Sequence, residues 1–466
     1  MFRCIYACRS AFWAATLALL LSACGGGGNS TTVTYTGGGV NSQGQSPAVS
    51  LPFTQLINNL PVTVEAGIGS GFSASINTNI LYATVTVCEP GTSHCVDVDH
   101  VQVDTGSVGL RIMASKLSTL NLPAIQVPTV ADANVTQPVW ECYQFVIGGL
   151  WGRMAAATVK LGNLSTADAT PSTPIPVQLI QDDTSSNVPQ ATMDCSSNTQ
   201  GSIMSSASAM GANGILGIGN VHIDCGSACV SGSYTSFIQY YNCPATASNS
   251  NICTAAQVGE NAQALNPVYA MPSPYNNGVV ISLPAVTGIG AATASGELIL
   301  GIDSASNNLV GTAQKIYLGT DPSLNNGDSY LSITTQYAGN TYYNSYFDTG
   351  SNALFFEDAS INTCNTGASF YCPGTEVSKT ALVSDGLTFP PQITAPITFS
   401  VGNANTLLAT ANAAFGNLAG TATVSPNATV VNTFDWGLPF FYGRKVFQSI
   451  WNLRDATGPW YAWTSN

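Results

Sequence analysis

The sequence predicts an all-β fold that is rich in turns. Of its 466 residues, 45% are hydrophobic and only 8% are charged, while Thr, Val, Ile, Tyr and Gly are common. Long Ala/Glu/Lys/Leu patterns, which are typical of helices, are absent. Residues 80–87 and 96–103 alternate apolar and polar side chains, which is the period of a strand with one buried face. The length fits about two domains.

The charge balance excludes one class of partner. The chain has 24 acidic and 11 basic residues, a formal net charge of −13, and no Lys or Arg between Arg9 and Arg111. Binding to nucleic-acid phosphates requires clustered basic side chains. We therefore expect no nucleic-acid partner. Apolar and aromatic residues run throughout the chain, which argues against intrinsic disorder.

The N-terminus is predicted to be a targeting segment. Two arginines precede an apolar stretch, residues 11–23, that has the length of a signal-peptide core. We therefore expect residues 1–23 to be a signal peptide. Its end, Leu-Ser-Ala followed by Cys24, resembles the lipobox of bacterial lipoproteins, in which the cysteine becomes the lipid-bearing N-terminus.

The residues that follow set the expected location. The resemblance implies the outer membrane, at its periplasmic face or the cell surface, because Gly25 and not Asp follows the cysteine. Residues 24–55 are then the lipidated cysteine and a flexible tether rich in Gly, Ser, Thr and Asn. The alternative is a plain secretory signal with an incidental cysteine.

The cysteine count agrees with export. Of thirteen cysteines, two lie in the signal segment and one is Cys24, which leaves ten. Ten cysteines in an oxidising compartment predict five disulfides. The spacing suggests Cys88 with Cys95, Cys225 with Cys229, Cys243 with Cys253, Cys364 with Cys372, and Cys142 with Cys195. Zinc binding by Cys95 with His94 and His100 is the alternative, but the spacing matches no zinc motif.

The chain contains the same tetrapeptide twice. Residues 104–107 and residues 348–351 both read Asp-Thr-Gly-Ser, and each copy follows an apolar strand and precedes a second apolar run. An Asp at the end of a buried strand is costly unless its carboxylate is hydrogen-bonded. One copy alone would be interpreted as a structural turn. Two copies, one in each half, can meet across a pseudo-twofold axis and place two carboxylates side by side.

At these residues the chain resembles the pepsin-like aspartic peptidases. Residues 214–219 (Gly-Ile-Leu-Gly-Ile-Gly) and 436–443 (Trp-Gly-Leu-Pro-Phe-Phe-Tyr-Gly) are similar to the strands that pass behind the two catalytic turns in that family. Residues 295–304 resemble the strand that leads into the second lobe. The landmarks occur in the family's order over roughly residues 70–451. The whole chain also resembles a group of bacterial lipoproteins of unknown function.

The resemblance implies a bilobal pepsin-like double β-barrel with pseudo-twofold symmetry and few short helices. The N-terminal lobe would comprise residues 56–290 and the C-terminal lobe residues 291–466. The Cys-rich insert around residues 225–253 is expected to be a surface loop. Two departures stand out: Pro439 replaces part of the usual second Gly-containing motif, and Arg111 stands where the family usually has an aromatic residue.

The family's site residues map onto both tetrapeptides. The resemblance implies that Asp104 and Asp348 form a catalytic dyad that activates a water molecule. Such a pair shares one proton, which is a general property of paired carboxyls in this family. The supporting residues would be Thr105 and Thr349, which lock the turns; Ser107 and Ser351, which bond the outer oxygens; and Gly106 and Gly350, which leave backbone room. No metal or cofactor is implied.

A hairpin at residues 141–152 is the expected flap. The family places a Tyr of this hairpin over its cleft, and the candidates here are Tyr143, Phe145 and Trp151. The alternative for any of these aromatics is simple packing. Arg111, if it points toward the dyad, would favour ionised carboxylates or select acidic substrates.

Two functions from different classes remain. The first is an exported, membrane-tethered aspartic endopeptidase that acts on peptide or protein substrates as a monomer. The second is a catalytically silent surface lipoprotein of the same fold that binds a peptide, glycan or protein in its cleft. A Ser-His-Asp triad is disfavoured because none of His94, His100 and His222 has a suitable setting and no G-x-S-x-G motif occurs. A glycosidase, which also uses two carboxylates, is disfavoured because the repeat would place these two carboxylates too close together and too symmetrically.

Overall fold

The computed structural model describes most of the chain after residue 56. The described residues are 57–69, 77–145, 148–170, 172–182, 189, 195, 202–232, 238–244, 253–320, 331–364, 370–386, 393–425, 428–429, 433–451 and 458–465. The predicted signal peptide, Cys24 and the tether lie outside them. All structural statements below concern the described residues, which belong to the compact unit Gln55–Asn466.

Strands dominate, and the helices are few and short, which confirms the predicted fold class. The α-helices are α2 (Ala207–Met210), α3 (Ser227–Ser231) and α4 (Ala404–Leu408). Single 3₁₀ turns occur at Ala114–Leu117, Thr166–Asp168, Glu260–Ala262 and Leu438–Phe441. No described helix is long and apolar enough to cross a membrane.

The largest sheet has 17 strands and draws on both ends of the described chain. Its strands are β1 (Asn59–Glu65), β2 (Ile80–Cys88), β3 (Cys95–Asp104), β4 (Val108–Met113), β5 (Gln126–Pro128), β6 (Thr136–Phe145), β7 (Gly148–Leu161), β8 (Leu164–Ser165), β9 (Ile175–Ile180), β10 (Gly214–Ile218), β11 (Ile238–Asn242), β12 (Thr254–Ala255), β13 (Gly278–Leu283), β14 (Ala294–Leu300), β15 (Ile316–Tyr317), β26 (Arg444–Ser449) and β27 (Trp460–Ser465).

The second sheet has eight strands and comes from the second half of the chain. Its strands are β16 (Gly319–Thr320), β17 (Leu331–Tyr337), β18 (Asn340–Phe347), β19 (Leu354–Phe355), β20 (Val377–Ser384), β21 (Thr394–Val401), β22 (Ala419–Gly420) and β25 (Thr433–Trp436). A separate hairpin joins β23 (Thr423–Ser425) to β24 (Ala428–Thr429).

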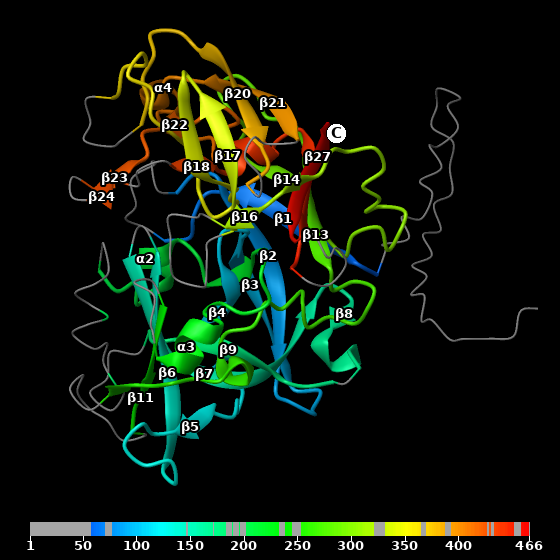
Figure 1. Ribbon diagram of the computed structural model, residues 1–466, viewed down its shortest axis with the longest axis vertical. Helices are drawn as coiled ribbons and strands as arrows, with labels where there is room; N and C mark the ends of the chain where they lie inside the picture. Colours follow the sequence, from blue (N-terminus) through cyan, green and yellow to red (C-terminus); the bar gives the residue numbers. More distant parts are fainter. Residues whose placement is uncertain are drawn as a thin grey trace, which may run out of the picture. The chain divides into compact units, whose positions relative to one another are not determined.

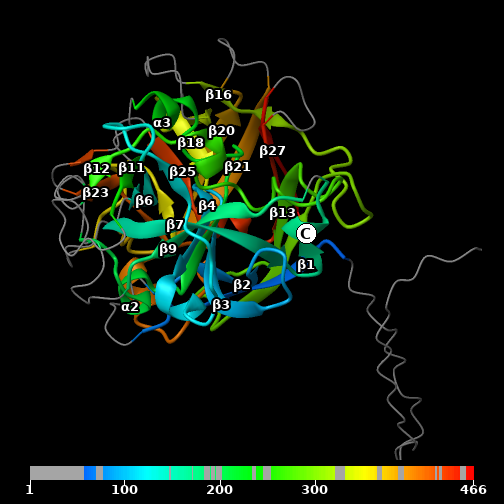
Figure 2. The ribbon, with the colours of Figure 1, turned by 90° about the horizontal axis from the view of Figure 1, so that it is seen from below.

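Six strands of the first half close a ring. β3 pairs with β2 and β10, β4 pairs with β10 and β9, and β7 pairs with β9 and β2. Figure 2 shows β2, β3, β4, β7 and β9 gathered at the centre of the view from below. Because the ring is closed, each of its six strands has a partner on both sides. A sheet without free edges is protected from pairing with other chains.

The second half repeats the order of pairing. β17 pairs antiparallel with β18, β18 parallel with β25, β25 antiparallel with β19, and β19 parallel with β22. In the first half, β2, β3, β10, β4 and β9 follow each other with the same alternation of directions. The pseudo-twofold repeat is therefore present in the topology. Among the described residues the second ring does not close, because no described strand pairs β22 with β20 or β21.

A layer of strands connects the halves. β1 pairs with β2 of the ring and with β14, and β13 and β26 extend the layer to β27 and β15. Figure 1 shows β1 and β14 between the second sheet above and the ring strands below, with β13 and β27 to their right. The expected strand at residues 295–304 is β14 and belongs to this layer.

The alternation of side chains in β3, the strand before the first tetrapeptide, determines which of its residues face the core. In β3, Val98, Val101 and Val103 are buried, while Asp97 and Asp99 face solvent. The alternation changes phase at His100, whose positive φ of 49° accompanies a register shift opposite β2. Such a bulge changes the face of the sheet toward which the following side chains point. The strand thus ends with Val103 in the core and Asp104 at the turn.

Candidate active site

Each Asp-Thr-Gly-Ser copy is a turn between two strands, and a third strand pairs with both of them. β3 ends at Asp104 and β4 begins at Val108, and β10 pairs with both strands. In the second copy, β18 ends at Phe347, just before Asp348, and β25 pairs with both β18 and β19. Residues 214–219 were expected to supply the first of these strands, and they contain β10. The segment expected to supply the second, residues 436–443, meets β25 (Thr433–Trp436) only at Trp436 and continues as the 3₁₀ turn Leu438–Phe441.

Each turn holds its own carboxylate in the same way. In the first turn, Oδ1 of Asp104 accepts the Gly106 N–H at 2.8 Å, and Oδ2 accepts the Ser107 hydroxyl at 2.5 Å. In the second turn, Oδ1 of Asp348 accepts the Gly350 N–H at 2.7 Å, and Oδ2 lies 2.8 Å from the Ser351 hydroxyl. The hydrogen bonds offset the desolvation of each carboxyl.

The two threonines bind the turns to one another. The Thr105 hydroxyl accepts the Thr349 N–H at 2.9 Å and donates to the Phe347 carbonyl at 3.0 Å. The Thr349 hydroxyl accepts the Thr105 N–H at 3.1 Å and donates to the Val103 carbonyl at 2.7 Å. All four bonds are buried and related by the pseudo-twofold repeat.

The carboxylates meet over the glycines. A Cβ atom on Gly350 would lie 2.6 Å from Oδ1 of Asp104 and 3.0 Å from Oδ1 of Asp348. A Cβ atom on Gly106 would lie 2.7 Å from Oδ1 of Asp348. The inner oxygens of both aspartates therefore lie around the same small volume, which a larger residue would fill. Gly106 is exposed and Gly350 partly exposed, so solvent reaches this volume.

The proximity of the two carboxyls changes the titration of Asp348. Burial raises the pKa of Asp348 to about 8, and the charge of Asp104 adds to this, while the hydrogen bonds from Ser351 and Gly350 oppose it. Two carboxylates this close cannot both ionise cheaply. The arrangement therefore favours a proton on Asp348, directly beside the Asp104 carboxyl group.

A third carboxyl, which the sequence analysis did not single out, adjoins the pair. Asp435 lies in β25, is 6% exposed, and its Oδ2 lies 2.6 Å from the Ser351 hydroxyl. Burial, and after it the charge of Asp348, raises the pKa of Asp435 well above its usual range. The sequence carried a signal for it, because Asp435 stands directly between two large aromatic residues, Phe434 and Trp436.

The expected flap hairpin is formed by β6 and β7, with Phe145 opposite Gly148 at the last described pair. The Tyr143 ring packs on the Phe145 ring, with 4.7 Å between centroids. Burial is the main cause of a raised pKa at Tyr143, and the charge of Asp104 contributes. The Tyr143 phenol therefore lies close enough to Asp104 to interact with its charge.

Trp151 lies inside the hairpin base instead. It is 1% exposed, stacks on Trp140 at 5.3 Å, and donates its indole N–H to the Pro189 carbonyl at 3.0 Å. It has the packing role that was the alternative for these aromatics. The Cys-rich insert is not merely a surface loop either, because β11 within it pairs with β6 and buries Tyr240.

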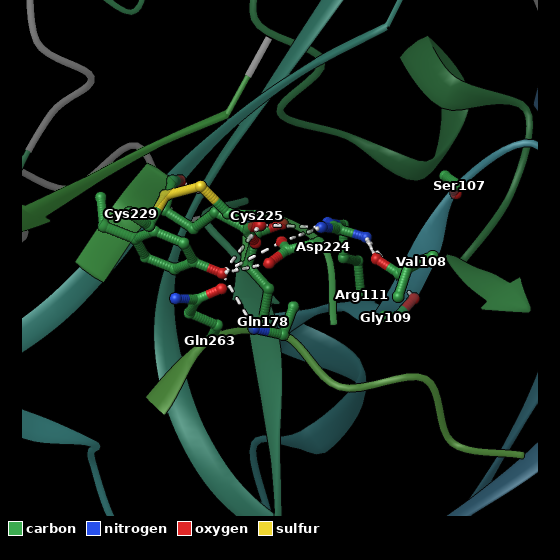
Figure 3. Close-up of polar contacts among 12 residues, drawn as sticks. Ser107, Val108, Gly109, Arg111, Gln178, Asp224, Cys225, Cys229 and Gln263 are labelled. Atoms are coloured by element: carbon green, nitrogen blue, oxygen red, sulfur yellow. Dashed lines mark hydrogen bonds and ion pairs between the residues drawn. A yellow bond between two sulfur atoms is a disulfide. The ribbon is translucent and has the colours of Figure 1, made fainter. Parts of the chain in front are cut away.

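Arg111 has partners other than the dyad. It is fully buried, and its Nη2 lies 2.7 Å from Oε1 of Glu141 and 3.1 Å from Oδ2 of Asp224. Its Nη1 donates to the Val108 carbonyl at 2.7 Å, and its guanidinium lies 3.9 Å from the centre of the Tyr143 ring. Figure 3 shows Arg111 between the Val108 carbonyl and Asp224. The roles that depended on Arg111 pointing toward the dyad are therefore replaced by an internal ion-pair network.

This network joins the flap strand to the first turn. Glu141 comes from β6, Arg111 from β4, and Asp224 from the segment before α3. The Tyr240 hydroxyl contacts both Asp224 oxygens at 3.0 Å. Burial lowers the pKa of Arg111, but the charges of Glu141, Tyr143 and Asp224 and the hydrogen bond to Glu141 together outweigh it, and the net direction is upward. Burial, and then Glu141, raises the pKa of Asp224.

The ten cysteines are paired as their spacing suggested. The disulfides are Cys88–Cys95, Cys142–Cys195, Cys225–Cys229, Cys243–Cys253 and Cys364–Cys372. Five disulfides are consistent with an extracytoplasmic protein.

The three histidines have local partners. His94 contacts Glu89, His100 contacts Asp99 and Glu65, and His222 packs on the Tyr269 ring. The described part of the chain contains no group of three or more His, Cys, Asp or Glu side chains placed to hold a metal ion. An open hollow lined by residues 124–128 and by Gln257, Gly259, Asn261 and Ala262 includes none of the tetrapeptide residues.

Comparison with known proteins yields a family and a structural likeness. An aspartic proteinase from Irpex lacteus has a structure similar to this one, with a TM-score of 0.44 and 14% sequence identity, covering 88% of this chain and 97% of that chain. No curated protein matches the sequence. The family described as "Protein of unknown function (DUF3443)" matches residues 54–463, and the chain belongs to that family.

Proposed function

We propose that this protein is an aspartic endopeptidase in which Asp104 and Asp348 activate a water molecule. The observation that carries the proposal is the placement of both inner carboxylate oxygens around Gly350, held by the reciprocal Thr105 and Thr349 hydrogen bonds. A purely structural turn does not require a second copy, a shared space and solvent access at once. Two hydrogen-bonded carboxyls that share one proton are what acid–base hydrolysis of an amide needs.

The raised pKa of Asp348 suggests the roles. Asp348 would hold the proton and donate it to the oxygen of the scissile carbonyl. Asp104, ionised, would accept a proton from the water, whose oxygen then attacks the carbonyl carbon. Collapse of the tetrahedral intermediate breaks the C–N bond as the amine takes up the proton from Asp104 and a hydroxyl of the intermediate returns its proton to Asp348, so the pair again holds one proton. Tyr143, in the flap hairpin, would shield the intermediate.

Cleavage of an unfolded protein substrate between pH 3 and pH 7 tests this proposal. The purified full-length protein is compared with its Asp104→Asn and Asp348→Asn variants, and with Asp358→Asn as a matched control outside the site. We expect acid-range cleavage that both dyad variants lose and the control retains. Absence of cleavage by the folded protein, or a dyad variant that cuts like the wild type, contradicts the proposal and favours a cleft that only binds.

We also propose export and lipid anchoring at Cys24, with the protein in the bacterial outer membrane. The lipobox-like end of the signal segment supports this, and the five disulfides agree with export. Cys24→Ser should release the protein from membranes into the aqueous fraction and abolish the mass of the lipid on the N-terminal peptide. Membrane retention of an unlipidated Cys24→Ser protein contradicts this anchor.

A further inference from the structure

Ser351 joins two carboxyl groups with one hydroxyl. Its Oγ lies 2.8 Å from Oδ2 of Asp348 and 2.6 Å from Oδ2 of Asp435. Both distances are those of hydrogen bonds. A serine hydroxyl has a single hydrogen to donate. Only one of the two contacts can therefore be a donation by Ser351, and the other needs a hydrogen that a carboxyl group supplies.

The hydrogen-bond partners indicate which carboxyl supplies it. Asp348 receives the Gly350 N–H at 2.7 Å, so its carboxyl group has a backbone donor as well as the serine. Oδ1 of Asp435 is buried and has no hydrogen-bond partner among the described residues. A buried carboxylate without donors is far more costly than a neutral carboxyl group. The hydrogen therefore belongs on Asp435.

The charges around Asp435 act in the same direction. Asp348 and Asp104 both lie close enough to raise its pKa, after burial as the main cause. Its other titratable neighbours are the phenols of Tyr346 and Tyr461, whose pKa values are raised chiefly by burial and in part by Asp435. Asp435 forms no ion pair with a described Lys, Arg or His. Among the described groups, the Ser351 hydroxyl opposes this by lowering the pKa of Asp435, and the net direction is still upward.

The first half of the molecule has no such third carboxyl. Ser107 contacts Oδ2 of Asp104, and Ile215 stands two residues before Gly217, where Asp435 stands two residues before Gly437. In the strand register Ile215 is opposite Arg111, and Asp435 is opposite Phe355. The pseudo-twofold repeat is thus broken by one acid on the Asp348 side.

We propose that Asp435 is a positioning residue that remains protonated and donates its hydrogen to Ser351, which commits the serine hydrogen to Asp348. The chain of donors runs from Asp435 Oδ2 through Ser351 Oγ to Asp348 Oδ2. It keeps a third negative charge away from the dyad and leaves the inner Oδ1 of Asp348 to face Asp104. The protonation of Asp435 follows from the contacts alone, whereas its consequence for peptide hydrolysis rests on the proposed function.

Infrared spectroscopy tests the protonation without any need for activity. The full-length protein, with its aspartate carboxyl carbons isotope-labelled, is compared at pH 6 with Asp435→Asn and with Asp358→Asn. Asp358 is a buried control that accepts hydrogen bonds from Ser360 and pairs with Lys379 at 3.0 Å, which lowers its pKa to about 2. We expect Asp435→Asn to lose one protonated-carboxyl band and Asp358→Asn to lose none. An unchanged band in folded Asp435→Asn overturns the proposal.

A second variant tests the direction of the hydrogen bond. Ser351→Ala removes the acceptor and leaves Asp435 in place, so the Asp435 band should persist and shift to the higher frequency of a carboxyl group without a hydrogen bond. A band that stays in position shows that Asp435 does not donate to Ser351 and overturns the proposed chain.

Peptide cleavage adds the part that depends on the proposed function. Asp435→Leu, which cannot donate, should lower kcat by about tenfold with little change in KM, since the loss of about one hydrogen bond is at stake. An Asp435 band in a protein that cleaves nothing refutes the peptidase and leaves the protonation intact. Cleavage that depends on Asp104, in a protein without an Asp435 band, supports the peptidase and refutes the protonation of Asp435.

Discussion

Thr105 and Thr349 exchange hydrogen bonds across the two halves of the molecule: each hydroxyl accepts the backbone N–H of the other residue, at 2.9 and 3.1 Å. Both residues are at most 2% exposed. Because each threonine also donates to the strand end of the opposite copy, the turns are fixed in distance and orientation.

Replacing one threonine should therefore weaken both halves. Thr349→Val keeps the shape but leaves the Thr105 N–H and the Val103 carbonyl unpaired, which should lower the free energy of unfolding by roughly 2–4 kcal/mol. Thr349→Ser keeps the hydroxyl and should cost about 1 kcal/mol for the lost methyl group. Denaturant unfolding measures both. Equal losses in the two variants indicate that packing, not the hydrogen bonds, is what matters there.

Gly350 should tolerate no side chain. The Cβ of Gly350→Ala would displace the inner oxygens of Asp104 and Asp348, so we expect about a hundredfold loss of kcat and a destabilisation of about 1–3 kcal/mol. Gly374→Ala is the matched control, since a Cβ there meets nothing within 4 Å. Kinetics and unfolding of the two variants are compared. Normal cleavage by Gly350→Ala rules out the shared volume as the reaction site.

The raised pKa of Asp348 makes a prediction about stability. The folded state holds this proton up to about pH 8, whereas the unfolded chain releases it near pH 3.8, so folding stability falls as pH rises between these values. Asp348→Asn removes the effect and should be more stable than wild type by roughly 2–4 kcal/mol at pH 8, with little difference near pH 4. Unfolding curves across this range test the sign.

Asp358 provides the opposite sign in the same experiment. Its hydrogen bonds lower its pKa to about 2, although burial acts against them, so its stabilisation is present above pH 3.8 and is lost as pH falls toward 2. Asp358→Asn should therefore destabilise the fold at neutral pH and matter less in strong acid. If both variants shift stability in the same direction at pH 8, the titration account of Asp348 is wrong.

The Arg111 network should be structural. Arg111→Met leaves Glu141 and Asp224 buried without their cation, which should cost roughly 3–5 kcal/mol at neutral pH. The loss should shrink in acid, where the carboxyls become protonated. Arg153→Met, in β7, is the control, because Arg153 forms no ion pair with the described residues. Thermal unfolding of both variants at pH 4 and pH 7 measures these losses. A stable Arg111→Met protein with an altered peptide preference would contradict the structural role and support a role of Arg111 in substrate selection.

Local sequence patterns were sufficient for the all-β class, for the two tetrapeptide turns and for the disulfides between near neighbours. Alternating apolar residues report a buried strand face, and an identical turn after two such strands reports a repeat, because both are properties of short segments. The close cysteine pairs are likewise limited by the few residues between them. The expected roles of Thr105 and Thr349 followed from resemblance, and their contacts are present in the structure.

Tertiary structure decided what the acids and the arginine do. Arg111 lies seven residues after Asp104, yet its charge is balanced by Glu141 and Asp224 from other segments. Asp435 lies far from Asp348 in sequence and reaches it only through Ser351. A charge in an apolar strand signals that some partner must exist, but the partner is set by the packing of distant strands. The sequence alone therefore determines that two carboxylates occupy equivalent turns, and the fold decides that a third stands beside one of them.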